Sequence, residues 1–414
     1  MYSFKMKILI FYQYYLPKNL GGVNRFNQLV SKWLEAGIDC TVICSKRSQF
    51  GMKIESGNEE ETPKGNNYGK LKVKRIMPLG GNKGNFFSRM LSYVSFSLFS
   101  FLVGLFERNV DVIIASSPPL TTATTGLWLR FLKRKPLVFD VRDLWPKCAV
   151  DLGFLSNKLA IKYSYRLERR AYKKASLVSV VTPDFMDYMK ECGVDEKKIV
   201  YIPNFSCDLD EYSTQETMEN KREMNLDGKF VVGYFGNHGH AANLSQLVDV
   251  AEIFMKENVN IHFILGGAGY KKVDIIESAR NKGLTNITFM QNLSRTDVLK
   301  YVRLCDACVT PLIPNESMKA VYPSKVFTYM ACKKPIIHTA DGACRKLLDE
   351  AQCGIYCKPD SPQNMAQIIL DLKNDSALRA EMGSKGYNYL VENFHPKDIS
   401  MRYLNSIKNI TKEN

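Results

Sequence analysis

The sequence predicts an α/β protein made of two parallel-sheet units in tandem. Its 414 residues are 45% apolar and 24% charged, which is ordinary globular composition, and they are too many for one typical core. Apolar strand-like runs alternate with helical segments through the first half, and a second cycle of the same kind begins at Lys229. Nearly continuous apolar strands separated by helices indicate parallel sheets covered on both faces, as in Rossmann-like domains.

The first unit begins with the strand-like run MKILIFY and the helical segment GVNRFNQLVSKWLEAG. Further strands are expected at CTVIC, VKRIMPL, DVIIAS, PLVFDV, LVSVVT and IVYIP. The polar segments ESGNEEETPKG and KGNNYGK predict a long surface excursion.

The segment from Phe86 to Arg108 is long and strongly aromatic. It contains Arg89, four serines after it, and Gly104, so it is a poor membrane-spanning helix. Two interpretations stay open: helices buried against the sheet, or a helical face that lies in the membrane interface.

The second unit begins with KFVVGYFGNHGHAANL, which predicts a strand, a glycine-containing turn and a helix. Its further strands are expected at IHFILGG, NITFM, ACVTPL, KPIIHT and GIYC. The polar segment NFSCDLDEYSTQETMENKREMNLDG separates the two units, which predicts a boundary near residue 204.

The net charge of +15 lies wholly in residues 1–200, which carry 32 Lys and Arg against 17 Asp and Glu. This half is therefore expected to face something acidic, such as anionic lipid or a phosphorylated substrate. The chain lacks a recognised nucleic-acid motif, so we expect no nucleic-acid partner. Scattered cysteines within apolar runs and an N-terminus without a signal-peptide pattern predict a reduced, cytoplasmic protein.

Ligands of open parallel sheets bind beyond the carboxyl ends of the strands, so the loops there are the candidate site. Gly21 and Gly22 precede a helix and allow close approach to a phosphate or sugar, although a tight turn explains them equally well. Pro323 and Ser324 start a helix with Lys325 beside them, and a cation at a helix N-terminus predicts a phosphate site.

Two further loops carry polar side chains. Asp140, Arg142 and Asp143 follow a buried strand in VFDVRDLWP; they form either a salt-bridged structural cluster or a site where a carboxylate accepts a hydroxyl proton and Arg142 meets phosphate. Asn237 and His238 follow the strand GYFG, where an imidazole could donate to phosphate; a polar turn explains the asparagine but not the histidines. A histidine metal pair has no obvious third ligand there, so we expect no metal.

The motifs GGVNRF, SSPPLTTATTGLWL, VFDVRDLWP, VYIPNF, VGYFGNHGHAANL and YPSKVFTYMACKKPII occur in order along the chain. In this they resemble glycosyltransferase family 4, and most closely its bacterial O-antigen, capsule and exopolysaccharide subgroup, which includes N-acetyl-fucosamine transferases. The resemblance implies a GT-B fold with two Rossmann-like domains facing across a cleft. The implied domains are an acceptor-binding domain at 1–204 joined by a C-terminal helix at about 394–414, and a nucleotide-sugar domain at 205–393.

The resemblance also implies a reaction. It is metal-independent retaining transfer of a sugar, of N-acetylhexosamine type and from a UDP donor, to a glycan on a polyprenyl-diphosphate lipid at the inner face of the cell membrane. Carried over by position, the catalytic residues are Asp140, Arg142, Asp143 and Lys325. The implied donor-binding residues are Gly21, Gly22, Gly236, Asn237, His238, Gln291, Asn292, Pro323, Ser324 and Thr328.

One departure from the family pattern affects donor binding. Much of the family carries two glutamates eight residues apart, and here Ala320 and Thr328 occupy these positions. A threonine gives one hydrogen bond to a ribose, worth roughly 1 kcal/mol net, where a carboxylate clamps two hydroxyls. Two alternatives therefore remain: a non-catalytic homologue that docks on the membrane, and a UDP-sugar epimerase or hydrolase on the same fold.

Overall fold

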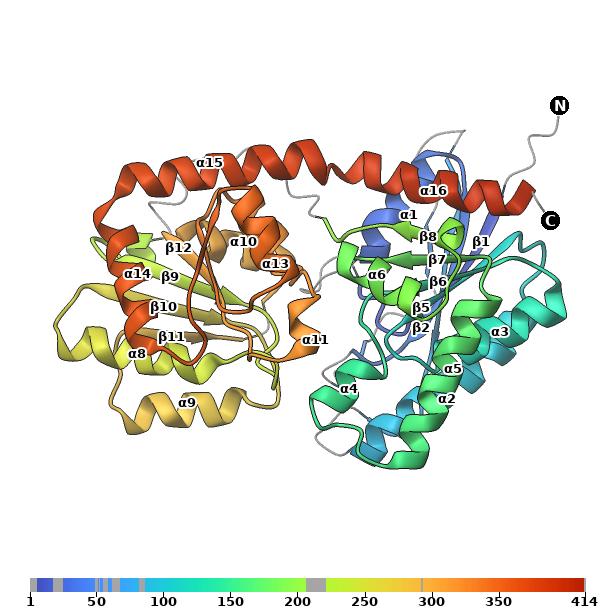
Figure 1. Cartoon of the computed structure of the whole chain (residues 1–414), viewed down its shortest axis with the longest axis horizontal. Coiled ribbons are helices and arrows are strands. Elements are labelled where there is room, and N and C mark those ends of the chain that lie inside the picture. The colour runs from blue at the N-terminus through green and yellow to red at the C-terminus, as the bar shows by residue number, and fades with distance from the viewer. Residues whose placement is uncertain are drawn as a thin grey trace. The chain divides into compact units, whose positions relative to one another are not determined.

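The computed structural model describes residues 6–17, 25–48, 51, 53–54, 59–61, 68–81, 86–205, 221–291 and 293–412. The chain divides into two compact units (Figure 1). Unit 1 contains the described residues up to Pro203 together with those from Pro396 onward, and unit 2 contains those from Asn204 to His395.

The sheet of unit 1 runs in the order β3-β4-β2-β1-β5-β6-β7-β8. Every described pair is parallel except β3 with β4. The predicted strands are confirmed, whereas the short β3 within the expected surface excursion was not predicted. The bounds are β1 Lys7–Phe11, β2 Asp39–Ser45, β3 Glu59–Glu61, β4 Leu71–Ile76, β5 Val112–Ser117, β6 Leu137–Val141, β7 Leu177–Val180 and β8 Ile199–Tyr201.

Helices cover both faces of this sheet. Helices α1 (Arg25–Glu35) and α16 (Pro396–Lys412) pack together on one face. The other face carries α2 (Phe86–Leu105), α3 (Thr122–Lys133), α5 (Lys158–Lys174) and α6 (Pro183–Glu191), as right-handed crossovers require (Figure 1). The remaining short helices of unit 1 are α4 (Lys147–Asp151) and the 3-10 turn η1 (Glu196–Lys198).

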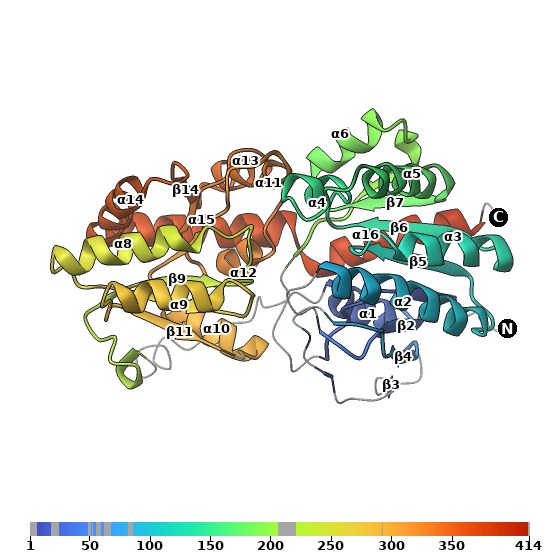
Figure 2. The same cartoon turned by 90° about the horizontal axis from the view of Figure 1, so that it is seen from below.

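The sheet of unit 2 is parallel and runs in the order β11-β10-β9-β12-β13-β14 (Figure 2). All its predicted strands are confirmed: β9 Phe230–Phe235, β10 Ile261–Gly266, β11 Ile287–Met290, β12 Ala307–Thr310, β13 Ile336–His338 and β14 Gly354–Tyr356. The helices are α8 Leu244–Lys256, α9 Lys272–Asn281, α10 Arg295–Leu304, α11 Glu316–Lys319, α12 Lys325–Ala331, α13 Ala343–Glu350, α14 Pro362–Asn374 and α15 Ser376–Asn393.

Local sequence explains where several helices begin. Ser294 and Asp297 form a capping box at the start of α10, so both residues satisfy backbone N–H groups that the helix leaves open. Asn157 accepts hydrogen bonds from the N–H groups of Leu159 and Ala160 at the start of α5.

The C-terminal helix that returns to the first domain is confirmed as α16. Helix α15 ends at Asn393 in unit 2, and α16 begins at Pro396 in unit 1. The indole Nε1 of Trp33 on α1 donates to the carbonyl of Ser400 at 3.1 Å, and the Trp33 and Tyr403 rings lie 5.6 Å apart. The last helix of the chain is therefore part of the core of unit 1.

Candidate active site

Two glycine loops meet at the carboxyl ends of β9 and β10 in unit 2. The N–H of Gly236 donates to the carbonyl of Gly266 at 2.9 Å. Gly267 has a φ of 135°, and a Cβ added to it would overlap the carbonyl oxygen of Gly236. Only glycine fits at this close approach, so the two loops present bare backbone at the switch point between β9 and β12.

Lys325, the first residue of α12, lies directly against these loops. Its Nζ is 3.8 Å from the centroid of the Tyr234 ring, and a Cβ on Gly236 would lie 2.5 Å from the same nitrogen. Desolvation lowers the pKa of Lys325 to about 7. Tyr234 is held in turn, because its hydroxyl donates to the carbonyl of Asn237 at 2.7 Å. A cation over an aromatic face beside bare backbone is suited to an anion.

Ser324 occupies the N-cap position of α12, as the predicted helix start requires, but its side chain makes no capping hydrogen bond. Thr328 lies one turn further along the same helix and is partly exposed. Both hydroxyls are thus on the helix that begins with Lys325. Pro323 is also partly exposed.

His238 is not accessible to a ligand. Its side chain is 0% exposed, and neither ring nitrogen meets hydrogen-bond geometry, although the Gly266 carbonyl lies near enough to favour the protonated ring. Burial, followed by the charge of Lys272, lowers the pKa of His238 to about 4. The prediction that His238 donates to phosphate is therefore wrong in this structure: the neutral ring packs edge-on to Tyr234.

Asn237 and Gln291 are both exposed, at the ends of β9 and β11. They remain candidates for contacting a ligand, as predicted. Gly21, Gly22 and Asn292 lie outside the described residues.

Lys272 at the start of α9 was not predicted. Its buried Nζ donates to the carbonyl of Gly267 at 2.7 Å and also to that of Met290, and burial lowers its pKa. The lysine thereby ties together the carboxyl ends of β10 and β11. The sequence shows a lysine soon after the glycine pair Gly266-Gly267, and this could have marked Lys272 as a candidate. The sequence could not show that its side chain turns inward.

Asp140 in unit 1 belongs to a buried network. Its carboxylate accepts hydrogen bonds from the hydroxyls of Ser116 and Ser179, each at 2.8 Å, and lies 3.4 Å from the guanidinium of Arg25. Both Asp140 and Arg25 are almost fully buried. The interpretation of Asp140 as a residue that contacts substrate is therefore corrected: it stabilises the interior, which was the alternative interpretation of this cluster.

Arg25, at the start of α1, also points inward. Its guanidinium donates to the carbonyls of Ile202 and Pro203, each at 2.7 Å. It thereby fixes the loop after β8 to the start of α1.

Arg142 and Asp143 follow β6, and the Arg142 side chain reaches the switch point between β1 and β5 of the unit 1 sheet. Arg142 stacks on the Tyr12 ring at 4.6 Å and donates to the Tyr12 hydroxyl, to Ser116 and to the Pro118 carbonyl. These partners come from the ends of β1 and β5, so the guanidinium joins three strand ends. Tyr12 was not predicted, although it directly follows the first strand.

Asp143 is partly exposed, unlike Asp140. Burial raises its pKa, and the neighbouring Arg142 charge opposes that rise. A carboxylate with a raised pKa at the open end of a sheet is suited to accept a proton.

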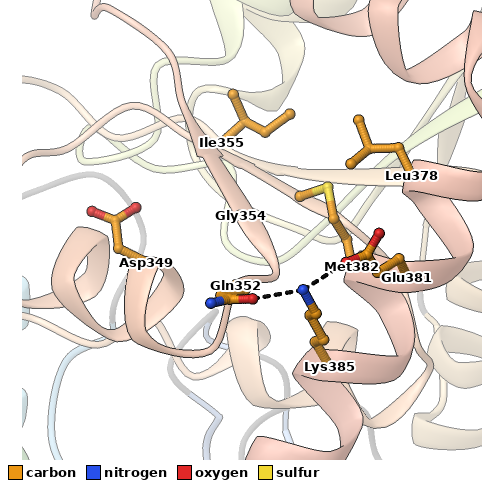
Figure 3. Close-up of a pocket in the computed structure, with 8 residues that line it drawn as sticks. All are labelled: Asp349, Gln352, Gly354, Ile355, Leu378, Glu381, Met382 and Lys385. Atoms are coloured by element: carbon orange, nitrogen blue, oxygen red, sulfur yellow. Dashed lines mark hydrogen bonds and ion pairs between the residues drawn. The ribbon is translucent and has the colours of Figure 1, made fainter.

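A pocket of about 360 Å³ elsewhere in unit 2 is a poor candidate for the site (Figure 3). Its lining includes Gly354 at the start of β14, so it lies at the opposite sheet edge from the glycine loops. Its charged groups are already paired, because Lys385 contacts Gln352 and Glu381, each at 2.6 Å. Within the described part of the chain, no three His, Cys, Asp or Glu side chains are grouped to hold a metal.

Two family models match the chain. Residues 21–204 match the glycosyl transferase 4-like domain, and residues 216–389 match glycosyl transferases group 1. Together these matches span most of both units.

Individual proteins agree with these matches. A probable glycosyltransferase WbjE of Pseudomonas aeruginosa is 26% identical over 304 residues, covering 70% of this chain and 72% of its own. The N,N'-diacetylbacillosaminyl-diphospho-undecaprenol alpha-1,3-N-acetylgalactosaminyltransferase of Campylobacter jejuni is 22% identical, covering 74% and 79%. The crystal structure of Anabaena Alr3699/HepE with UDP-glucose superposes with a TM-score of 0.72 at 17% identity, covering 98% and 100%.

The matches and the two parallel-sheet units agree on one assignment, which confirms the resemblance and the fold predicted from the sequence. The chain belongs to the glycosyltransferases that join a glycosyl transferase 4-like domain to a group 1 domain, and it has the GT-B fold.

Proposed function

We propose that this glycosyltransferase moves a sugar of N-acetylhexosamine type from a UDP donor to a lipid-linked glycan precursor, with retention of the anomeric configuration. The observation that carries the donor half of the proposal is the position of Lys325. Its ammonium lies against the glycine loops at the ends of β9 and β10, and among the described residues it has no carboxylate partner. A diphosphate bound there would supply the missing counterion.

In the transfer step, the bond between the anomeric carbon and the diphosphate oxygen breaks, and the acceptor oxygen bonds to the same face of that carbon, which retains its configuration. The electron pair of the broken bond leaves on the diphosphate, where Lys325 would stabilise the new negative charge. The proton of the acceptor hydroxyl passes to a base, and we assign Asp143 this role because the residue is partly exposed at the end of β6 and burial raises its pKa. Because a lysine supplies the electrostatic stabilisation, we propose that the reaction needs no metal.

The names of relatives support the donor and acceptor classes. The Campylobacter relative carries a name that specifies an undecaprenyl-diphosphate acceptor, an N-acetylgalactosaminyl group and an alpha linkage. HepE was crystallised with UDP-glucose. An acceptor of this kind lies in a membrane, so we propose that the enzyme works at the inner face of the cell membrane, where the positive charge of its first half would attract anionic lipid.

The first test is thermal unfolding of the protein with UDP, GDP, ADP or CMP. A ligand that binds only the native state raises the melting temperature. At a ligand concentration of a hundred times its Kd, binding adds about 2.7 kcal/mol to the free energy of unfolding. We expect a rise with UDP in the wild type, no rise in Lys325→Ala, and an unchanged rise in Lys346→Ala. Lys346 is a matched control, since it is an exposed lysine on α13 in the same unit.

Turnover then separates the remaining alternatives. We expect UDP-sugar to be consumed only when a lipid-linked acceptor is present, and NMR of the product to show the anomeric configuration of the donor. Consumption without acceptor would favour an epimerase or hydrolase. The absence of both nucleotide binding and turnover would favour a non-catalytic homologue and would contradict the proposal.

A further inference from the structure

Helix α2 exposes a continuous stripe of large apolar side chains. Its members follow one another at intervals of three or four residues, which places them on one face of the helix. Phe87, at one end, is 78% exposed. The others are Leu91, Val94, Leu98, Leu102 and Leu105, and Phe106 extends the row beyond the helix.

The opposite face of α2, which packs on unit 1, is lined by small and hydroxyl side chains. Apart from Phe96, its buried residues are serines and a glycine: Ser92, Ser95, Ser97, Ser100 and Gly104. Ser97 contacts the hydroxyl of Thr125 at 2.9 Å, and a Cβ on Gly104 would lie 2.7 Å from Phe11. The helix therefore buries its small residues and exposes its large apolar ones, the reverse of a helix that faces water.

Helix α3 repeats this arrangement. Its buried face carries Thr122, Ala123, Thr125 and Gly126 with one large residue, Leu129, whereas Trp128 is 57% exposed and Phe131 is 72% exposed. Lys133 at the end of α3 donates to the carbonyls of Leu105 and Glu107 at 2.9 and 2.7 Å, which ties this end of α3 to the end of α2. We call these exposed apolar residues of α2 and α3, with Phe106, the apolar face.

Basic side chains border the apolar face. Helix α5 packs beside α3 and also exposes Leu159 and Tyr163. A hollow of about 380 Å³ on α5, lined by Lys162, Tyr165, Arg166 and Arg169, faces α4 and the end of α6 and is not counted in this border. The C-terminal end of α3 adds Arg134, and Arg108 follows Phe106. Cations around an exposed apolar surface complement the phosphates of anionic lipid around acyl chains.

We propose that the apolar face inserts into the headgroup and acyl boundary of an anionic membrane leaflet, with α2 lying along the membrane plane. This inference rests on the proposed function for the lipid-linked acceptor, and it adds the surface and the mode of attachment.

Helix α2 is long and apolar enough to span a membrane, by length and composition alone. Its serine face is bonded to unit 1, however, so the helix lies on the protein and exposes one side. A contiguous row of exposed large apolar side chains marks an interaction surface. Lipid fits this surface, because the exposed stripe of α2 is uniformly apolar and the exposed Arg108 and Arg134 follow the ends of α2 and α3.

The experiment uses the full chain and phosphatidylcholine vesicles with or without phosphatidylglycerol. Trp128 is a built-in reporter, because Trp33 is fully buried and Trp145 is partly buried. We expect the protein to float together with vesicles that contain phosphatidylglycerol. Lipids brominated on their acyl chains should quench its tryptophan fluorescence, and Trp128→Phe should lose that quenching.

The variant Val94→Ser, Leu98→Ser, Leu102→Ser removes half of the α2 stripe without touching the core. We expect it to keep the wild-type melting temperature and to partition into vesicles at least about tenfold more weakly. Val273→Ser is the matched control, since Val273 is 62% exposed in unit 2 and Val94 is 54% exposed. It should bind vesicles like the wild type.

Three results would overturn the proposal. The first is equal flotation of the triple variant and the wild type. The second is flotation that moderate salt abolishes and that is not accompanied by bromine quenching, because such flotation indicates purely electrostatic contact. The third is a dimer in lipid-free sedimentation that the triple variant loses, which assigns the face to a second copy. Transfer to a water-soluble acceptor, measured on the same proteins, tests the proposed function separately and should be unchanged in the triple variant.

Discussion

The two units share a parallel-sheet plan but differ in the groups that they leave unsatisfied. Unit 1 pairs its buried cation, Arg25, with Asp140, yet exposes the apolar face of α2 and α3. Unit 2 covers most of its large apolar side chains, apart from Tyr270 and Val273, yet leaves Lys325 without a carboxylate partner among the described residues. In each unit the unsatisfied group indicates the missing partner: a lipid surface for unit 1 and a compact anion for unit 2.

Helix α8 shows what α2 would look like if it faced water. It buries Leu247, Val250 and Phe254 in the core of unit 2 and exposes Lys256. Helix α2 covers the sheet of unit 1 with this polarity reversed. Helices α2 and α8 differ in which side chains face outward, and not in backbone conformation. The difference therefore reflects what surrounds each helix, and not the fold.

The largest effect expected from the charged groups is a loss of stability on breaking the buried pair of unit 1. Asp140→Ala leaves the Arg25 guanidinium uncompensated and should lower the free energy of unfolding by about 3–5 kcal/mol. Asp143→Ala removes a carboxylate whose charged form burial already disfavours, so it should leave stability unchanged or slightly higher.

Denaturant unfolding measures both variants, and transfer assays complete the comparison. Asp143→Ala should lower turnover by a factor of about 100 or more if this carboxylate is the base. The assignments of the two carboxylates would be reversed by one pair of results. In that case Asp143→Ala would be less stable than the wild type but fully active, and Asp140→Ala would be as stable as the wild type.

A second prediction tests whether the cation of unit 2 awaits an anion. The pKa of Lys325 is about 7 in the free protein, and a bound diphosphate must raise it. Donor binding therefore takes up a proton above pH 7, and affinity should fall by up to about tenfold per pH unit from pH 7 upward.

Calorimetry with a UDP-sugar, in buffers of different ionisation enthalpy, detects this proton uptake. Lys325→Ala should bind more weakly and show no such dependence on pH. An affinity that is constant from pH 6.5 to pH 9 in the wild type would mean that Lys325 does not meet the diphosphate.

The smallest effect concerns Thr328, where much of the family carries glutamate. Thr328→Glu would let a carboxylate accept two ribose hydroxyls, and we expect UDP to bind more tightly by about 1–2 kcal/mol. The uncharged variant Thr328→Gln should gain less, and 2′-deoxy-UDP should lose most of the gain. Equal gains with UDP and 2′-deoxy-UDP would show that residue 328 does not face the ribose.

Most of the fold could be predicted from the sequence, because parallel strands that are buried on both faces consist of consecutive apolar residues. The short β3 was missed, because EEE carries no strand signal and forms its ladder only through pairing with β4. The C-terminal helix came from the family resemblance. Its packing on Trp33 depends on contacts between residues far apart in sequence.

The candidate site was only partly readable. Loop positions follow from topology, so the neighbourhood of Lys325 and Gly236 was predictable. Side-chain direction was not: His238, Arg25 and Asp140 all turn inward. Spacing could not distinguish them from the accessible Asn237 and Asp143, because burial depends on the neighbouring strands.

The same limit explains α2. Composition showed an apolar helix interrupted by serines, and both a buried and a membrane-facing interpretation were consistent with it. Only the packed structure shows that Ser92, Ser97 and Ser100 form the inner face, because helical spacing fixes which residues share a face but not which face turns inward.

The position of α16 has a consequence for synthesis. Ser179 joins Asp140 to the hydroxyl of Tyr403, at 2.8 Å to each, and Tyr403 is translated after the whole of unit 2. The core of unit 1 therefore closes only after unit 2, which the chain encodes later, has been fully made. During synthesis, α1 of unit 1 stays uncovered until α16 has been made. Any truncation before Pro396 therefore removes part of the core of unit 1, although it shortens the chain beyond unit 2.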